Sequence, residues 1–278
     1  MNANHVVAGV SPVEPRPELV IWAAAEAHTR HATLRLVAAY PPRASAEDEA
    51  LAQAVLGWAA ALAADRRPGL PMVTRAVPGP PEHVLRVEAT GADLLVIGAD
   101  DHSPFVEAIN GSIPAALLST APCPIVVVPK GSVPAPDIAP VLVGVDTAET
   151  SRSALDYAFV AADRSGRDLH AVLCWIAARD RVDRRAERVE QQRALAIALA
   201  GFAERYPDVA VTEFIVDSDP IEDLGRRSRR AGLLVLGSRG RGRLASLAFG
   251  SVSRTLIRNS HCPTVVVRPD RHAAGIAS

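Results

Sequence analysis

The stretch RAGLLVLGSRGRGRLASLAFGS, Arg230–Ser251, joins an apolar run to a glycine-rich loop and then to a helix-like segment. The apolar run, Leu233–Leu236, is short and unbroken, as in the strands of a parallel sheet that are buried on both faces. The loop begins at Gly237, where that run ends. Because ligands in open α/β sheets bind beyond the carboxyl ends of the strands, this position predicts a binding loop.

This pattern of apolar run, loop and helix-like segment belongs to a repeat that occurs twice in the chain. The matching pairs are GADLLVIGAD from Gly91 with RAGLLVLGSR from Arg230, VVAGVSPVE from Val6 with VLVGVDTAE from Val141, and the segments around Cys123 and Cys262. The offset grows from 135 to 139 residues, so the second copy is slightly longer in its middle. A Pro-rich stretch that suits neither helix nor central strand separates the copies. We therefore predict domains at 1–130 and 140–278, with a linker at 131–139.

Each copy alternates β-rich apolar runs with segments of helical apolar spacing. In the second copy the predicted strands are VLVGV, LHAVLCW, VAVTEFIV, LLVLG and TVVV. The predicted helices are 152–163, 183–205 and a short one that Asp219 caps and Pro220 starts. This order predicts an α/β fold of two tandem doubly wound, Rossmann-like domains, each a five-stranded parallel sheet flanked by helices.

Neither familiar phosphate-loop pattern fits the glycine loop. Gly237 and Gly242 have the P-loop spacing, but Arg243 and Leu244 stand where that loop needs Lys and Ser or Thr. The dinucleotide pattern fits through Gly240, Gly242 and Ala245, but no acidic residue follows about twenty positions later at a strand end.

A third spacing fits without exception: Gly237-x-x-Gly240, nine residues, then Gly250-Ser251. With the opening VLVGVD and the closing CPTVVVRP, it resembles the ATP-binding signature of the universal stress protein family, over the whole chain twice. The resemblance implies a nucleotide-linked regulator in stress response that binds ATP through its second domain. The residues it assigns to the nucleotide site are Gly144, Asp146, Cys174, Leu236, Gly237, Ser238, Arg239, Gly240, Arg241, Gly242, Gly250, Ser251 and Val252.

The physical chemistry of the loop favours an anion independently of the resemblance. Glycines adopt positive φ and let the backbone approach an anion closely. Gly250 and Ser251 open a helix whose N-terminus favours negative charge, and Ser251 either caps that helix or bonds a phosphate oxygen. Arg239, Arg241 and Arg243 add positive charge. A surface turn with solvated arginines is the alternative interpretation.

Asp146 ends the first strand of the second copy, at the same predicted sheet edge as the loop. The resemblance implies that it contacts the adenosine part of ATP; an N-cap of the following helix is a second role that the sequence allows. Gly144 lies beside it in VGVD. Cys174 and Trp175 end the second strand and are expected to border the adenine, with the inward-pointing one undecided.

The first copy has lost most of the signature. Its loop reads GADDHSPFVEAINGS, in which Gly98, Gly111 and Ser112 remain but Asp100, Asp101 and Glu107 bring negative charge; Ser11 stands where the second copy has Asp146. Like charges at about 4 Å repel by roughly 4 kcal/mol at an effective dielectric of about 20. We predict that the first domain does not bind ATP in the family's manner. A different ligand, a structural role, or a metal held by Asp100 and Asp101 stays open.

Composition and motifs narrow the function class. Thirty basic and thirty-one acidic residues, with a pI near 6.7, give no overall field for nucleic acid or anionic membranes. No apolar stretch approaches the length of about 18 residues that spans a bilayer, and no secretion signal is evident, so we expect a cytoplasmic protein without membrane or nucleic-acid partners. Three cysteines without metal spacing indicate a reduced compartment.

The sequence favours binding over catalysis. Eight histidines show no metal-ligand spacing, and no catalytic triad or P-loop lysine is evident, so we expect no catalytic and no metal-ligating residues. We predict ATP as ligand, with accompanying Mg²⁺ left open; a slow ATP hydrolase and a ligand-free structural stress factor are the alternatives. The apolar last strands PIVVVP and PTVVV have the character of exposed edges, so the two domains are expected to pair through them as an intrachain pseudo-dimer. Two chains are expected to assemble further as a homodimer.

Overall fold

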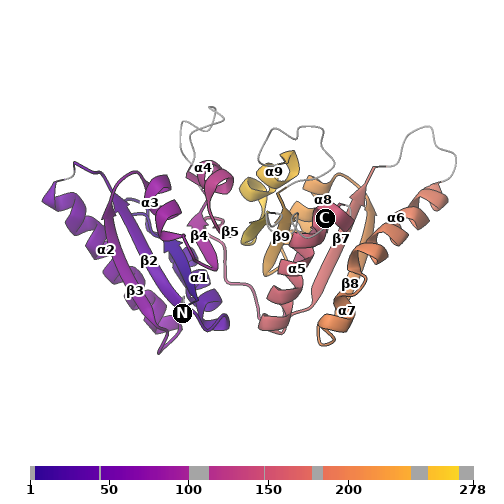
Figure 1. Ribbon diagram of the computed structural model, residues 1–278, viewed down its shortest axis with the longest axis horizontal. Coiled ribbons are helices and arrows are strands. Elements are labelled where there is room, and N and C mark those ends of the chain that lie inside the picture. The colour runs from indigo at the N-terminus through magenta and orange to yellow at the C-terminus, as the bar shows by residue number, and fades with distance from the viewer. Residues whose placement is uncertain are drawn as a thin grey trace, which may run out of the picture. The chain divides into compact units, whose positions relative to one another are not determined.

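The computed structural model describes residues 4–43, 45–99, 113–146, 148–176, 184–238 and 250–268. The chain forms two compact units, Met1–Pro134 and Ala135–Ser278 (Figure 1).

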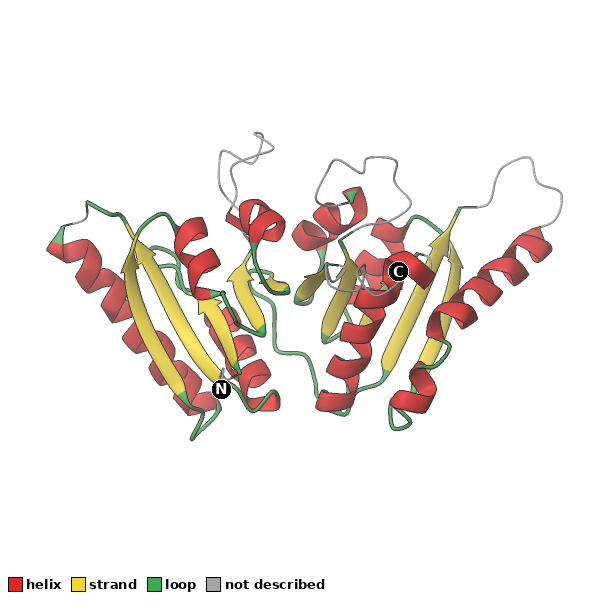
Figure 2. Ribbon diagram, viewed as in Figure 1, coloured by secondary structure: helices red, strands yellow, loops and turns green. Residues whose placement is uncertain are grey.

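The first unit contains a five-stranded parallel sheet in the order β3-β2-β1-β4-β5. Helices α1 and α2 pack on one face, and α3 and α4 on the other (Figure 2). The strands are β1 (His5–Gly9), β2 (Thr33–Tyr40), β3 (Met72–Pro78), β4 (Leu94–Gly98) and β5 (Ile125–Val128). The helices are α1 (Pro17–Thr29), α2 (Ala46–Arg66), α3 (Pro81–Glu88) and α4 (Ile113–Thr120).

The second unit repeats this arrangement, with the strand order β8-β7-β6-β9-β10. Helices α5 and α6 cover one face, and α8 and α9 the other. The strands are β6 (Val141–Val145), β7 (Leu169–Trp175), β8 (Val211–Asp217), β9 (Leu233–Gly237) and β10 (Thr264–Val267). The helices are α5 (Ala148–Ser165), α6 (Arg184–Leu199), α7 (Phe202–Arg205), α8 (Pro220–Ser228) and α9 (Ser251–Asn259).

The predicted fold class is confirmed. The central strands β4, β6 and β9 are short runs of Val, Leu and Ile that are almost wholly buried, as expected for parallel strands covered on both faces. At the start of α8 the Asp219 carboxylate accepts hydrogen bonds from the backbone N–H groups of Ile221 at 2.8 Å and Glu222 at 3.3 Å. The N-cap predicted for that helix is therefore present.

The single helix predicted at 183–205 is wrong in one respect. The structure has two helices there, α6 and α7, and Gly201 lies between them with φ +80. This left-handed backbone conformation ends one helix and starts the next, and glycine adopts it without steric cost. Helical periodicity continues across Gly201, so the spacing of apolar residues did not reveal the break.

One glycine in each unit lets the first strand approach a helix. A Cβ placed on Gly9 would lie 2.9 Å from Leu85 Cδ1, and a Cβ placed on Gly144 would lie 3.0 Å from Leu224 Cδ1. Both leucines belong to the equivalent helices, α3 and α8. Packing against this leucine therefore favours glycine near the end of the strand in both units, independently of any ligand.

Candidate functional site

The candidate site of the second unit lies at the carboxyl ends of β6 and β9, which are neighbours in the sheet. From β6 the chain continues to β7 on one side, and it returns as β9 on the other. Such a reversal of strand order is where open α/β sheets bind ligands. Asp146 follows β6 directly and Gly237 ends β9, so the structure brings these two predicted residues to the same sheet edge.

The two ends of the glycine loop are joined at this edge. The Gly250 N–H donates a hydrogen bond of 3.2 Å to the Ser238 carbonyl. Ser253 Oγ, from the first turn of α9, donates one of 2.9 Å to the Gly237 carbonyl. The Ser238 N–H in turn donates to the Val267 carbonyl at 2.9 Å. The described residues on the two sides of 239–249 are therefore held together at the rim by main-chain bonds and one hydroxyl.

The first turn of α9 begins at this point of the rim without a capping side chain. Gly250 is the N-cap residue, with φ -67 and ψ 157, and it makes no side-chain cap hydrogen bond. Of the two roles that the sequence left open for Ser251, the N-cap does not hold, because Ser251 is the first residue inside the helix. Its bond to a phosphate oxygen stays a prediction. The first N–H groups of a helix have no acceptor within it, so those of Ser251 and Val252 can serve an anion.

Asp146 is half-buried and its backbone is fixed by a serine that the sequence reasoning overlooked. The Asp146 N–H donates a hydrogen bond of 2.8 Å to Ser151 Oγ, and Ser151 is buried in α5. Its alternative role as an N-cap stays a prediction, since Thr147, which separates it from the first residue of α5, lies outside the described residues. A hydroxyl one turn into the helix that follows β6 is the signal that could have identified Ser151.

The sheet face under α8 and α9 carries the apolar part of the site. Leu236 is buried there in a cluster with Leu224 and Leu256, and the half-buried Cys174 and Val252 pack against it. Because strand side chains alternate, Trp175 points to the opposite face. Of the two residues that the sequence left open, Cys174 is the one on the face under α8 and α9, and its contact with adenine stays a prediction. Burial raises the pKa of the Cys174 thiol to about 12, so this side chain is a neutral, apolar wall.

Several predicted phosphate-binding residues belong to the middle of the glycine loop. Arg239, Gly240, Arg241 and Gly242, as well as Arg243, lie outside the described residues, so their contacts with phosphate stay predictions. Gly144 is placed, but it lies against Leu224 and Leu236, so packing alone accounts for its identity.

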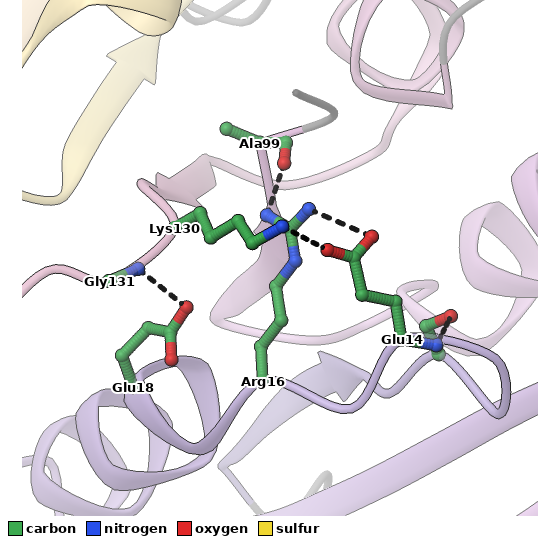
Figure 3. A network of polar contacts seen from close by, with 7 residues as sticks. Glu14, Arg16, Glu18, Ala99, Lys130 and Gly131 are labelled. Atoms are coloured by element: carbon green, nitrogen blue, oxygen red, sulfur yellow. Dashed lines mark hydrogen bonds and ion pairs between the residues drawn. The ribbon is translucent and has the colours of Figure 1, made fainter. Parts of the chain in front are cut away.

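The equivalent edge of the first unit carries cations that the sequence reasoning missed. Arg16 donates hydrogen bonds to the Ala99 carbonyl and to Glu14, and Lys130 Nζ lies 2.7 Å from Glu14 Oε1 (Figure 3). The charge argument for this domain used Asp100, Asp101 and Glu107, which lie outside the described residues, as do Gly111 and Ser112. Arg16 and Lys130 are 114 positions apart, and no motif links them.

The family is settled by comparison with known proteins. The pattern of the Universal stress protein family matches residues 2–129 and 138–268. The chain belongs to the universal stress protein family. The universal stress protein Rv2623 of Mycobacterium tuberculosis is 33% identical over 284 residues, which cover 95% of this chain and 96% of that protein. Tandem universal stress domains therefore extend over nearly the whole chain, as the internal repeat indicated.

A solved structure that matches over the whole length agrees on the fold. A universal stress protein from Archaeoglobus fulgidus covers 96% of this chain and 97% of its own, at 18% identity and a TM-score of 0.70. A universal stress protein solved in complex with cAMP matches 46% of this chain and 98% of its own, at 26% identity and a TM-score of 0.39.

Within the parts of this chain that the structure describes, no helix combines the length and apolarity needed to cross a membrane.

Proposed function

We propose that the second unit of this universal stress protein binds an adenine nucleotide, ATP in the first place, and acts as a nucleotide-linked regulator in stress response. The observation that carries the proposal is the closure of the glycine loop at the rim, from Ser238 to Gly250, beside Asp146. A family signature alone could be a surface turn. This loop starts at the point where the strand order reverses, and an uncapped helix N-terminus follows it. Both features favour the binding of an anion.

The proposed site has one surface for the nucleoside and another for the phosphates. Cys174, Leu236 and Val252 offer the apolar surface that a nucleobase requires. Asp146 would accept hydrogen bonds from the ribose or the base. The N–H groups of α9 and the arginines of the loop would face the phosphates, where Mg²⁺ would accompany ATP.

Gly250 has a narrower role in this proposal than the signature suggests. Its N–H already donates to the Ser238 carbonyl, so it would hold the loop closed rather than bind phosphate directly. The donors left for phosphate are the N–H groups one or two residues further on, at Ser251 and Val252.

We propose binding rather than turnover as the activity. Transfer of the terminal phosphoryl group requires a positioned base or water-orienting group in addition to charge stabilisation. The rim offers main-chain donors and arginines, and Asp146 is assigned to the nucleoside. A slow hydrolase remains the second candidate, and a single-turnover assay with ATP and Mg²⁺ would reveal it by formation of ADP faster than in buffer without the protein.

The test is calorimetric titration of ATP into the full chain and into Gly240→Asp, which copies the first domain's loop. We expect the variant to lose at least about tenfold in affinity, since a carboxylate replaces a backbone approach to phosphate. Asp101→Gly, the reverse change at the aligned position, is the matched control and should leave affinity unchanged. Equal binding by the parent and Gly240→Asp would refute the site.

Two further properties belong to this proposal. We place the protein in the cytoplasm, where ATP is abundant, and we expect two chains to assemble as a homodimer. Mass spectrometry of nucleotide retained during purification tests the ligand directly. Sedimentation equilibrium tests the homodimer, and a monomer at all accessible concentrations would contradict it.

A further inference from the structure

The first unit contains a cavity of about 140 Å³ at the carboxyl ends of β1 and β4. Most of its wall is aliphatic, from Leu19, Val37, Leu85 and Ile97 among others. Three polar residues, Ser11, Glu14 and Arg16, line the same cavity. An apolar cavity of about 150 Å³ accommodates a single benzene ring, so this one fits a ligand with one small ring or a short aliphatic chain.

Arg16 is held rigidly at this cavity. Its side chain is 10% exposed, and its Nη1 donates to the Ala99 carbonyl at the end of β4 (Figure 3). A Cβ on Gly98 would lie 3.0 Å from Arg16 Cδ and Nη1, so the guanidinium rests against the glycine backbone. With Nη1 fixed in this way, the Nη2 edge points toward Glu14. A guanidinium fixed through Nη1, with its Nη2 edge turned toward an exposed side chain, is well suited to a carboxylate.

A carboxylate of the protein itself already lies at that edge. Glu14 Oε1 is 2.7 Å from Lys130 Nζ, whereas Glu14 Oε2 is 3.5 Å from Arg16 Nη2, at the long limit of a hydrogen bond. The Lys130 ammonium, and then Arg16, hold the pKa of Glu14 below its usual range, so it is ionised at neutral pH. Glu14 is 50% exposed, so its side chain can move into solvent at little cost.

We propose that this cavity binds a small monocarboxylate with an apolar body, and that Glu14 is the resident carboxylate which the ligand displaces from Arg16 and Lys130. The aliphatic wall takes the body of the ligand, and the Nη2 edge of Arg16 takes its carboxylate. The second unit has Ser151 at the position aligned with Arg16, so the two units are specialised for different ligands. The inference does not depend on nucleotide binding by the second unit.

The experiment titrates benzoate and its neutral isostere benzamide into the full chain labelled with ¹³C in its Ile methyl groups. The probe of the site is the Ile97 resonance, assigned with Ile97→Val, since Ile97 is buried in the cavity wall. We expect benzoate to shift this resonance and benzamide to bind at least about tenfold more weakly, because it lacks the charge that Arg16 recognises. Equal affinities, or no shift with benzoate, would overturn the proposal.

Variants separate the roles of the charged residues. Glu14→Gln removes the competing carboxylate and should tighten benzoate binding roughly two- to fivefold, the range for an exposed ion pair. Glu149→Gln, at the aligned position of the second unit, is the matched control and should change nothing. No gain with Glu14→Gln, or the same gain with Glu149→Gln, would refute the assignment.

Arg16 is tested by two substitutions, because one of them could disturb folding. Arg16→Ser copies the second unit and should abolish the benzoate shift. Arg16→Lys keeps the charge but loses the planar fork, and should weaken benzoate binding several-fold while the chain stays folded. Parental affinity in Arg16→Lys would show that the guanidinium is not the recognition group. Gly240→Asp should leave benzoate binding unchanged, so failure of the nucleotide site is distinguishable from failure of this one.

Discussion

Replacing Gly144 by alanine tests whether this glycine serves packing or the ligand. The new Cβ would lie 3.0 Å from Leu224 Cδ1 and 3.3 Å from Leu236 Cδ2, closer than ordinary contact. Both leucines are buried in one cluster and have little freedom to move. Overpacking of this kind costs about 1–3 kcal/mol, offset by about 0.4–1 kcal/mol from the less flexible unfolded chain. We expect Gly144→Ala to lower the free energy of unfolding of the second unit by about 1–2 kcal/mol.

The measurement is urea unfolding followed by Trp175 fluorescence, in a background with Trp22→Phe and Trp58→Phe. Trp175 then reports on the second unit alone. Gly225→Ala is the matched control in the same unit, because a Cβ there would meet Leu256 Cδ2 at an ordinary 3.8 Å. Within α8 this change should stabilise by about 0.5–1 kcal/mol. If both substitutions have the same sign, or Gly144→Ala is neutral, the packing explanation fails.

Three other predictions follow from described contacts. Ser253→Ala removes the bond to the Gly237 carbonyl and should cost about 1 kcal/mol of stability in urea unfolding and weaken ATP binding; unchanged stability would contradict the role given to this hydroxyl. Glu14 has a folded pKa below the ordinary 4.5, so its contribution to stability is present above the unfolded pKa and is lost as pH falls through the lowered one. Thermal unfolding of Glu14→Gln should therefore differ from the parent at neutral pH and coincide with it in acid, and a constant difference would show that the ion pair with Lys130 is not responsible. Burial raises the pKa of the Cys262 thiol to about 12. Iodoacetamide at mildly alkaline pH should therefore modify Cys262 only after unfolding, and fast modification of Cys262 itself in the native chain would exclude its burial.

The fold could be predicted from the sequence because the signals for strands and helix starts act between residues that are close in the chain. The runs that became β6 and β9 are apolar throughout, and the duplication showed each strand and loop twice. Asp219 and Pro220 marked the start of α8 for a reason that acts within one helical turn. The same local rules missed the break at Gly201 and left two roles open for Ser251. A glycine inside a helical pattern and a serine after a glycine each permit two backbone conformations, and the residues packed around them select one.

The contacts between charged residues at the rim of the first unit could not be predicted from local sequence patterns. The acidic residues of its loop are adjacent in sequence, whereas Arg16, Lys130 and Glu14 meet only because β1, β4 and β5 end at the same edge. Likewise, Ser253 reaches the Gly237 carbonyl across sixteen positions. The sequence by itself determined two tandem α/β units, their strands and the loop with the binding signature. Only the tertiary structure decided which side chains gather at each rim, because contacts between distant residues depend on how the strands are ordered and how the helices pack on them.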